Sequence, residues 1–161
     1  ILTTIAIATL PLVEQRLAIP FGFFSQNLPI WIATTAGLIG NIASVAIVLW
    51  LWPIIAKLAA KHSPFCNRIL QKIFEKTRTK HSHRFHTWGS IFLVFFVMLP
   101  IPGSGGWSGS LIAWLFGETY GKALSLISIG LLFGALIIAG MTVGADELIT
   151  LVNGLFSGAP L

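Results

Sequence analysis

Two ionisable side chains, Glu14 and Arg16, interrupt an apolar stretch near the start of the sequence. A charge near the centre of a bilayer costs about 3 kcal/mol or more, so we expect both to face the protein interior. A dehydrated carboxyl group favours its neutral form, which suits Glu14 to carrying a proton. Arg16 keeps its proton and suits a counter-charge or an anchor for an anionic group. The alternative is a structural pair in which Arg16 only neutralises Glu14.

A second candidate region is the stretch LPIPGSGGWSG at residues 99–109. Its glycines expose backbone N–H groups, its serines add hydroxyls, and its tryptophan is placed to contact or gate a substrate. Helices beginning near Leu17 and Trp107 would direct partial positive charge at one shared volume, which suits a phosphate or carboxylate. The alternative is that the glycines only allow close packing. The predicted substrate contacts are Arg16, Ser104, Gly105, Gly106, Trp107 and Ser108.

Sequence patterns for dinucleotide binding, metal binding or enzyme catalysis are weak or absent. The glycine spacing does not fit the G-x-G-x-x-G dinucleotide pattern, and no strand precedes it. The histidines in KHSHRFH have no carboxylate or cysteine nearby, and Lys80 and Arg84 would repel a cation, so we predict no metal site. We expect these histidines to contact lipid headgroups. No nucleophile–base pair is evident, and we predict neither an enzyme nor a cofactor other than the proton.

The composition indicates the environment of these groups. The chain has 161 residues, of which 9% are charged, and its mean hydropathy is +0.88. Soluble domains carry about 25% charged residues, so we predict an integral membrane protein with one domain over residues 1–161. Residues 30–56 and 122–145 are each long enough to span a bilayer.

Four other apolar segments are too short to span. Residues 88–99 would form roughly 18 Å of helix, half a bilayer, before the proline- and glycine-rich stretch and a second half-length at 107–117. Segments 1–10 and 17–28 repeat this arrangement around PLVEQR. Each pair is predicted to be a re-entrant hairpin that turns near the midplane. The predicted breaks involve Pro11, Pro20, Pro100, Pro102, Gly103 and Gly109.

Together these segments predict an all-α membrane protein with an internal inverted repeat. Each unit, 1–56 and 87–145, is a re-entrant hairpin plus a transmembrane helix. The linking loop 57–86 holds eight of the ten basic residues, which predicts a cytoplasmic location. Nucleic-acid binding is the rival reading of a basic cluster, and the membrane segments on both sides of the loop argue against it. Residues 68–76 show the pattern of an interfacial helix. The pairs Gly130/Gly134 and Gly140/Gly144 predict packing faces within the bundle or in a homodimer.

The motifs LPLVEQRLAIPFG and LPIPGSGGWSG, with Gly40-Asn41 between them, resemble the small multidrug export protein family of prokaryotes. The resemblance covers about residues 9–144. The family pattern E-L-R-G-A-I-P is matched except at Gln15 and Leu17, and P-x-P-G-T-G-A-W-T-G is matched with serine for threonine at 104 and 108 and glycine for alanine at 106. The resemblance implies a distant relationship to the DedA superfamily, whose members have paired re-entrant hairpins and in some cases recycle polyprenyl-phosphate lipids.

These observations favour a secondary transporter in a prokaryotic cytoplasmic membrane. We expect Glu14 to couple transport to protons and the two hairpin tips to bind a small amphiphile with an anionic group, such as a lipid-linked phosphate. Its partners would be this substrate, membrane lipids and a second copy of the chain, and not a nucleic acid. The alternatives are an exporter of small organic cations, as the family name suggests, an uncoupled lipid path, and a membrane scaffold.

Overall fold

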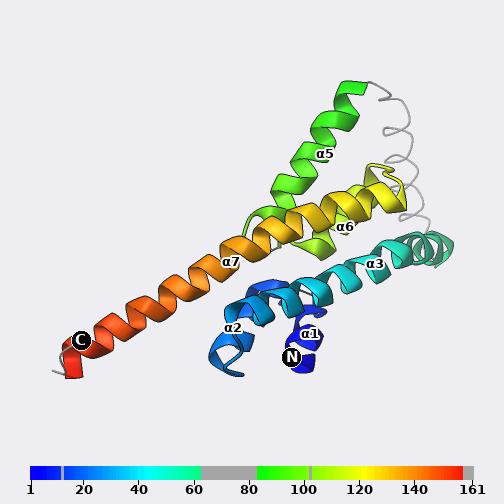
Figure 1. Ribbon diagram of the computed structural model, residues 1–161. Helices are drawn as coiled ribbons and strands as arrows, with labels where there is room; N and C mark the ends of the chain where they lie inside the picture. The colour runs from blue at the N-terminus through cyan, green and yellow to red at the C-terminus, as the bar shows by residue number, and fades with distance from the viewer. Residues whose placement is uncertain (12, 63–82, 102, 158–161) are drawn as a thin grey trace.

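A computed structural model describes residues 1–11, 13–62, 83–101 and 103–157. Over these residues the chain is helical, with no strand, as predicted. The helices are α1 (Leu2–Ala8), α2 (Glu14–Phe24), α3 (Ile30–His62), α5 (His83–Met98), α6 (Gly106–Leu115) and α7 (Tyr120–Ser157). Figure 1 shows them as one bundle in which α5 and α1 lie on opposite sides of the α3–α7 pair.

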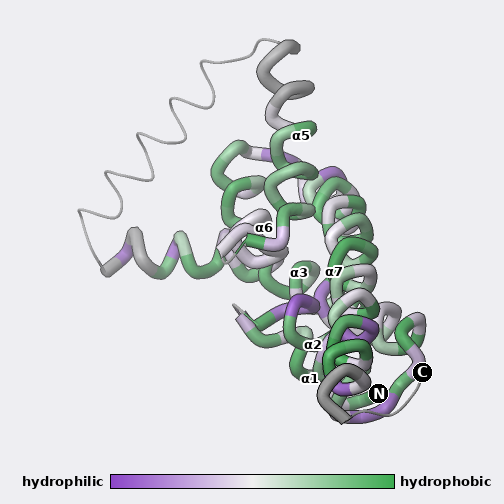
Figure 2. The backbone as a smooth tube through the Cα atoms, turned by 90° about the vertical axis from the view of Figure 1, so that its left-hand side faces the viewer, coloured by the Kyte–Doolittle hydropathy of each residue, from purple (hydrophilic) through white to green (hydrophobic). Residues whose placement is uncertain are grey.

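The two long helices are apolar enough to cross a membrane. Their candidate spans are Ile30–Leu58 and Tyr120–Gly154, with mean hydropathies of 2.1 and 2.4, and most of the tube through them has the colour of hydrophobic residues (Figure 2). Both helices run past the predicted ends at 56 and 145, because lysines and carboxylates are tolerated inside a helix. The C-terminal end of α7 extends beyond the other helices (Figure 1).

The four short helices have 7, 11, 16 and 10 residues. At about 1.5 Å per residue they reach only about 10 to 24 Å, less than the hydrocarbon thickness of a bilayer. The first of each pair packs on one long helix, α1 on α3 and α5 on α7, whereas α2 and α6 each contact both long helices. The two helices that follow the breaks therefore lie at the centre of the bundle.

Glycines let the short helices approach the long ones closely. A methyl group at Gly40 of α3 would lie 2.5 Å from the carbonyl oxygen of Ile5 in α1. A methyl group at Gly130 of α7 would lie 2.8 Å from the carbonyl oxygen of Val94 in α5. Small residues allow such backbone contact between helices in membranes. In both halves of the chain, a glycine of the long helix thus allows the first short helix to pack closely against it.

Several predicted features differ from what is observed. Pro20 was expected at a break but lies inside α2, which is held by α1, α3 and α7 although proline removes one intrahelical hydrogen bond. Gly109 was also expected at a break and is buried inside α6, where a methyl group would overlap Val97. Pro11, Pro100 and Gly103 lie between helices as predicted.

The predicted linker between the two halves differs from the structure at both of its ends. Helix α3 continues to His62 and α5 begins at His83, so the ends of the predicted loop 57–86 are helical. The predicted interfacial helix and Pro102 lie outside the described residues.

Candidate functional site

The first part of the site is the N-terminal end of α6. This helix begins at Gly106 after an extended Gly105, and the N–H of Gly105 donates to the hydroxyl of Ser108 at 3.0 Å. The first N–H groups of a helix have no partner within the helix and carry partial positive charge. The start of α6 therefore needs an acceptor from elsewhere in the fold.

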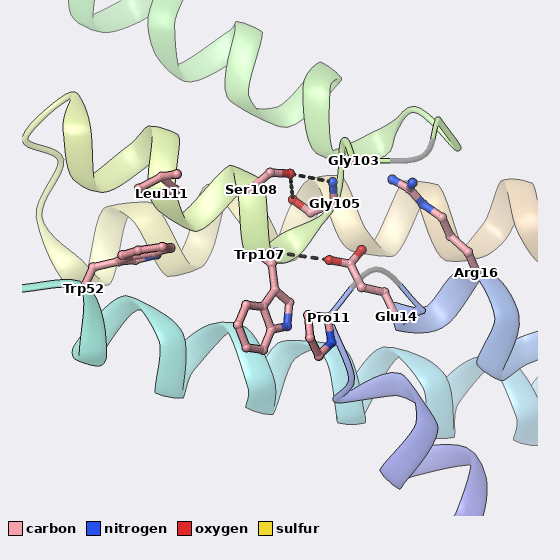
Figure 3. Close-up of a pocket in the computed structure, with 9 residues that line it drawn as sticks. All are labelled: Pro11, Glu14, Arg16, Trp52, Gly103, Gly105, Trp107, Ser108 and Leu111. Carbon is pink, nitrogen blue, oxygen red and sulfur yellow. Dashed lines mark hydrogen bonds between the residues drawn. The ribbon is translucent and has the colours of Figure 1, made fainter. Parts of the chain in front are cut away.

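Glu14 supplies that acceptor from the other half of the chain. Its carboxylate Oε1 accepts a hydrogen bond from the backbone N–H of Trp107, the second residue of α6, at 3.1 Å (Figure 3). The Glu14 residue is 3% exposed and has a φ of +47°, a left-handed backbone conformation that non-glycine residues seldom adopt. Strain of this kind persists where surrounding contacts fix it and is frequent at functional sites.

Gly105 leaves the space that this carboxylate occupies. A methyl group on its α-carbon would overlap both carboxylate oxygens of Glu14. The glycine is needed here for close approach, since its φ of −126° is open to any residue. The backbone of one break and the side chain of the other thus fit together at a single point.

Arg16 completes the second part of the site at the C-terminal end of α5. Its Nη2 donates to the carbonyl of Leu99 and to the hydroxyl of Ser104, each at 3.1 Å. Further hydrogen bonds run from the guanidinium to the carbonyls of Ile101 and Ser104. These carbonyls follow the last residue of α5, Met98, where a helix carries partial negative charge.

The two charges therefore complement two helix ends. The cation lies at the end of α5 and the anion at the start of α6, the arrangement that the helix dipoles favour. Neither of the two readings made from the sequence, a substrate anchor or a mutual ion pair, anticipated this arrangement. Among the described residues, the guanidinium of Arg16 takes carbonyl and hydroxyl oxygens as its hydrogen-bond partners.

A cavity of about 260 Å³ opens beside these contacts. Figure 3 shows the residues that line it. The Glu14 carboxylate points toward the backbone of α6, and Arg16 lies beyond Gly103 at the end of the lining opposite Trp52. Its lining residues are Pro11, Glu14, Arg16, Trp52, Gly103, Gly105, Trp107, Ser108 and Leu111. Two predicted contacts lie elsewhere: Ser104 is buried under Arg16, and Gly106 packs against Val45 and Asn41.

Sequence reasoning missed the polar residues that tie the two breaks together. The indole N–H of Trp107 donates to Ser44 at 2.9 Å, and the hydroxyl of Ser44 donates to the carbonyl of Thr9 at 3.0 Å, at the end of α1. The side chain of Ser110 in turn accepts from the indole of Trp52 at 3.0 Å. Ser44 is a single serine in an apolar segment and Ser110 ends the glycine- and serine-rich stretch, and nothing in their spacing predicts these partners.

Two buried amides add unused hydrogen-bonding capacity near the start of α6. Asn41 is fully buried, and neither its amide nitrogen nor its oxygen has a hydrogen-bond partner among the described residues. Its oxygen would lie 3.1 Å from a methyl group placed on Gly106. Gln15 donates to the carbonyl of Leu131 at 2.9 Å, but within the described part of the chain its own side-chain oxygen has no partner. Buried polar groups without partners are uncommon and mark positions where water or a ligand can bind.

Comparison with known proteins identifies the family. The family model described as "Putative small multi-drug export protein" matches residues 14–137. The match begins at Glu14 and includes α2, α3, α5 and α6 and the first half of α7. Searches of curated proteins and of solved structures found no match. The chain belongs to the small multidrug export protein family.

Proposed function

We propose that this member of the small multidrug export family is a proton-coupled secondary transporter for a small amphiphile with an anionic group. The observation that carries the proposal is the position of Glu14. Its carboxylate lies on the start of α6 and lines the cavity at the same time. The protonation state of one side chain then decides whether that helix end is free for another anion.

The proposed coupling follows from competition for the same backbone donor. An ionised Glu14 satisfies the N–H of Trp107, and a second negative charge beside it would be repelled. A protonated Glu14 loses that charge, and its neutral carbonyl oxygen is a weaker acceptor at the helix end than an anion. A substrate phosphate or carboxylate could then take the N–H group together with the hydroxyl of Ser108 at the cavity wall. Proton and anion would therefore bind to the same state of the protein.

Arg16 has a positioning role in this proposal. Its hydrogen bonds to the carbonyls after α5 hold the second break in shape, and it also lines the cavity. A guanidinium fixed in this way adds positive potential to the cavity without leaving its partners. It favours an anionic substrate group over a cationic one at this position.

We further propose that α1–α2 and α5–α6 are re-entrant hairpins in two inverted units. Their short lengths and the matching glycine contacts of α3 and α7 support this reading. With loop 57–86 on the cytoplasmic side of a prokaryotic inner membrane, the two breaks would meet near the midplane. Irregular backbone at that depth requires protein or a wet cavity around it, and the cavity beside the breaks suits that requirement.

The test is proton uptake by proteoliposomes that contain a pH-sensitive dye. Alkyl phosphates and small organic cations are added as separate sets to wild type, Glu14→Gln and Glu147→Gln, the last being an exposed carboxylate on α7. We expect alkyl phosphates to drive proton flux in wild type and Glu147→Gln and none in Glu14→Gln. Equal proton flux in both variants would remove Glu14 from the coupling, and substrate movement without protons would replace coupled transport by an uncoupled lipid path. No movement of either set would favour a scaffold.

Export of organic cations is the second candidate. The family description supports it, and so does a carboxylate on a cavity wall. In that case the organic-cation set would move protons and the alkyl phosphates would not. The same assay separates the two candidates.

A further inference from the structure

Buried polar atoms without a hydrogen-bond partner are confined to one half of the bundle. Four such side-chain atoms occur among the described residues, and none of them belongs to α5, α6 or α7. They are the hydroxyl oxygen of Thr4 in α1, the side-chain oxygen of Gln15 in α2, and the nitrogen and oxygen of the Asn41 amide in α3. These residues are 0%, 3% and 0% exposed. An unpaired polar group is costly inside a bundle that lipid surrounds, so their concentration in one place requires a cause.

Asn41 and Gln15 lie close to the Glu14 carboxylate. A methyl group placed on Gly106 would lie 3.1 Å from the Asn41 oxygen, and Gly106 directly precedes the residue whose N–H bonds Glu14. A methyl group on Gly37, one turn before Asn41 in α3, would lie 3.7 Å from the Cβ of Gln15. Gln15 itself follows Glu14 in α2. Both amides therefore stand next to the proposed proton carrier.

Thr4 lies farther toward the N-terminal end of α3. A methyl group on Gly22 of α2 would lie 3.1 Å from both the Thr4 hydroxyl and the Cβ of Ala33. At about 1.5 Å per residue, Ala33 lies about 12 Å from Asn41 along α3, whereas Trp52 on the cavity wall lies about 16 Å from it in the opposite direction. Figure 1 shows α1 and α2 beside the N-terminal half of α3. In a helix that spans a membrane, the cavity and the unpartnered groups thus lead toward opposite membrane faces.

A single isoleucine separates the two amides from Thr4. Ile19 of α2 is fully buried, and its Cγ1 would lie 2.9 Å from a methyl group on Gly37. Gln15, Ile19 and Gly22 follow one another at spacings of four and three, so they share one face of α2. Ile19 therefore stands between the level of Gln15 and the level of Thr4. An apolar side chain at a narrow point keeps water out, and its displacement lets water in.

We propose that a path for water connects Glu14 with the membrane face opposite the cavity, and that Ile19 is the gate of this path. The path is lined by Thr4, Gln15 and Asn41. The inference rests on the proposed function, because it gives Glu14 a second route for its proton. Water fits the lining, since the Asn41 amide offers it both a donor and an acceptor. A neutral Glu14 would pass its proton to this water, and the carboxylate left behind would again accept its hydrogen bond from the start of α6.

The test is the passive leak of protons into proteoliposomes that contain a pH-sensitive dye, driven by a potassium diffusion potential without any substrate. Ile19→Ala opens the gate. Ile127→Ala is the matched control, because Ile127 is equally buried but packs with residues of α3, α5 and α6. We expect the leak of Ile19→Ala to be at least about tenfold faster than that of wild type, and that of Ile127→Ala to be close to wild type. Equal leaks in the two alanine variants would overturn the proposal.

Two apolar substitutions test whether the leak follows the unpartnered groups. Thr4→Val and Asn41→Leu keep the branched shape of each side chain and remove only polar atoms that have no partner, so the fold should tolerate them. Added to Ile19→Ala, each should reduce the leak about fivefold or more. Thr35→Val is the control, because Thr35 is exposed and its hydroxyl bonds within α3. A leak that neither substitution reduces, or that Thr35→Val reduces equally, would contradict the path.

The leak also separates this inference from the proposed function, because it requires no substrate. A leak of Ile19→Ala that Thr4→Val abolishes but Glu14→Gln does not would support the water path and remove Glu14 from the coupling. Substrate-driven proton flux that is lost in Glu14→Gln, together with equal leaks in Ile19→Ala and Ile127→Ala, would support the proposed function and overturn the path.

Discussion

The two breaks in the bundle contribute different kinds of residue to the contacts between them. The break between α1 and α2 is followed by Glu14 and Arg16, whereas the break between α5 and α6 carries two glycines, one serine and no ionisable side chain among its described residues. The charges of the first break satisfy the helix ends of the second. Neither break is complete by itself, which makes the pair a single unit divided between two halves of the chain.

This division separates rigid from adjustable contacts. Arg16 bonds several oxygens at once and keeps its charge at any physiological pH. Glu14 makes one backbone hydrogen bond and can change its charge by binding a proton. We expect the α5 end to stay fixed while the α6 end responds to ligands.

The largest effect should come from Arg16→Gln. The glutamine is too short to reach the carbonyls of Leu99, Ile101 and Ser104 and carries no charge, so these carbonyls would be left without their charged donor. We expect the free energy of unfolding to fall by about 3 kcal/mol, measured by denaturant titration of the purified protein. Arg16→Lys should recover less than half of this loss, because an ammonium cannot match the planar fork of a guanidinium. Full recovery by lysine would show that only charge matters at this break.

Gly105→Ala should have the next largest effect. Its methyl group would overlap the Glu14 carboxylate and force that side chain off the start of α6. We expect a loss of about 2 kcal/mol in the free energy of unfolding, together with loss of proton-coupled flux.

Gly140→Ala provides the matched control, because a methyl group there meets nothing within 4 Å and α7 is continuous around it. It should be neutral or stabilise the protein by about 1 kcal/mol through helix propensity. If both alanine variants changed the free energy of unfolding by the same amount, the close approach at Gly105 would contribute nothing to stability.

Glu14→Gln should cost less, because the amide oxygen can still accept the N–H of Trp107. What is lost is the attraction between a full charge and the helix end, about 1 kcal/mol or less. We expect Glu14→Gln to unfold at a slightly lower temperature than wild type. Thermal unfolding of the two proteins under the same conditions measures the difference, and equal midpoints would show that Glu14 has no role as a charged cap.

The sequence was sufficient for features that depend on length and composition. The long spans follow from apolar runs, and the breaks at Pro11, Pro100 and Gly103 follow from residues that cannot continue a helix. It was insufficient where a residue's partner lies far along the chain. Glu14 seemed to interrupt a helix when considered alone, yet it begins α2 because its charge is satisfied by α6, 93 residues away. The preference of Pro20 for a helix break was likewise outweighed by the packing of α2 against three neighbouring helices.

The smallest expected effect is the coupling energy of the hydrogen bond that links the breaks through Ser44. Trp107→Phe keeps an aromatic ring on the cavity wall but removes the indole N–H that Ser44 accepts. Ser44→Ala removes the acceptor and also the donor to the carbonyl of Thr9. Each change should reduce the free energy of unfolding by about 1 kcal/mol. A double-mutant cycle should give a coupling energy of about 0.5 to 1 kcal/mol, since residues in direct contact are not additive. Additive losses would mean that the two breaks are held together by Glu14 and Arg16 alone, and that the link through Ser44 contributes only packing.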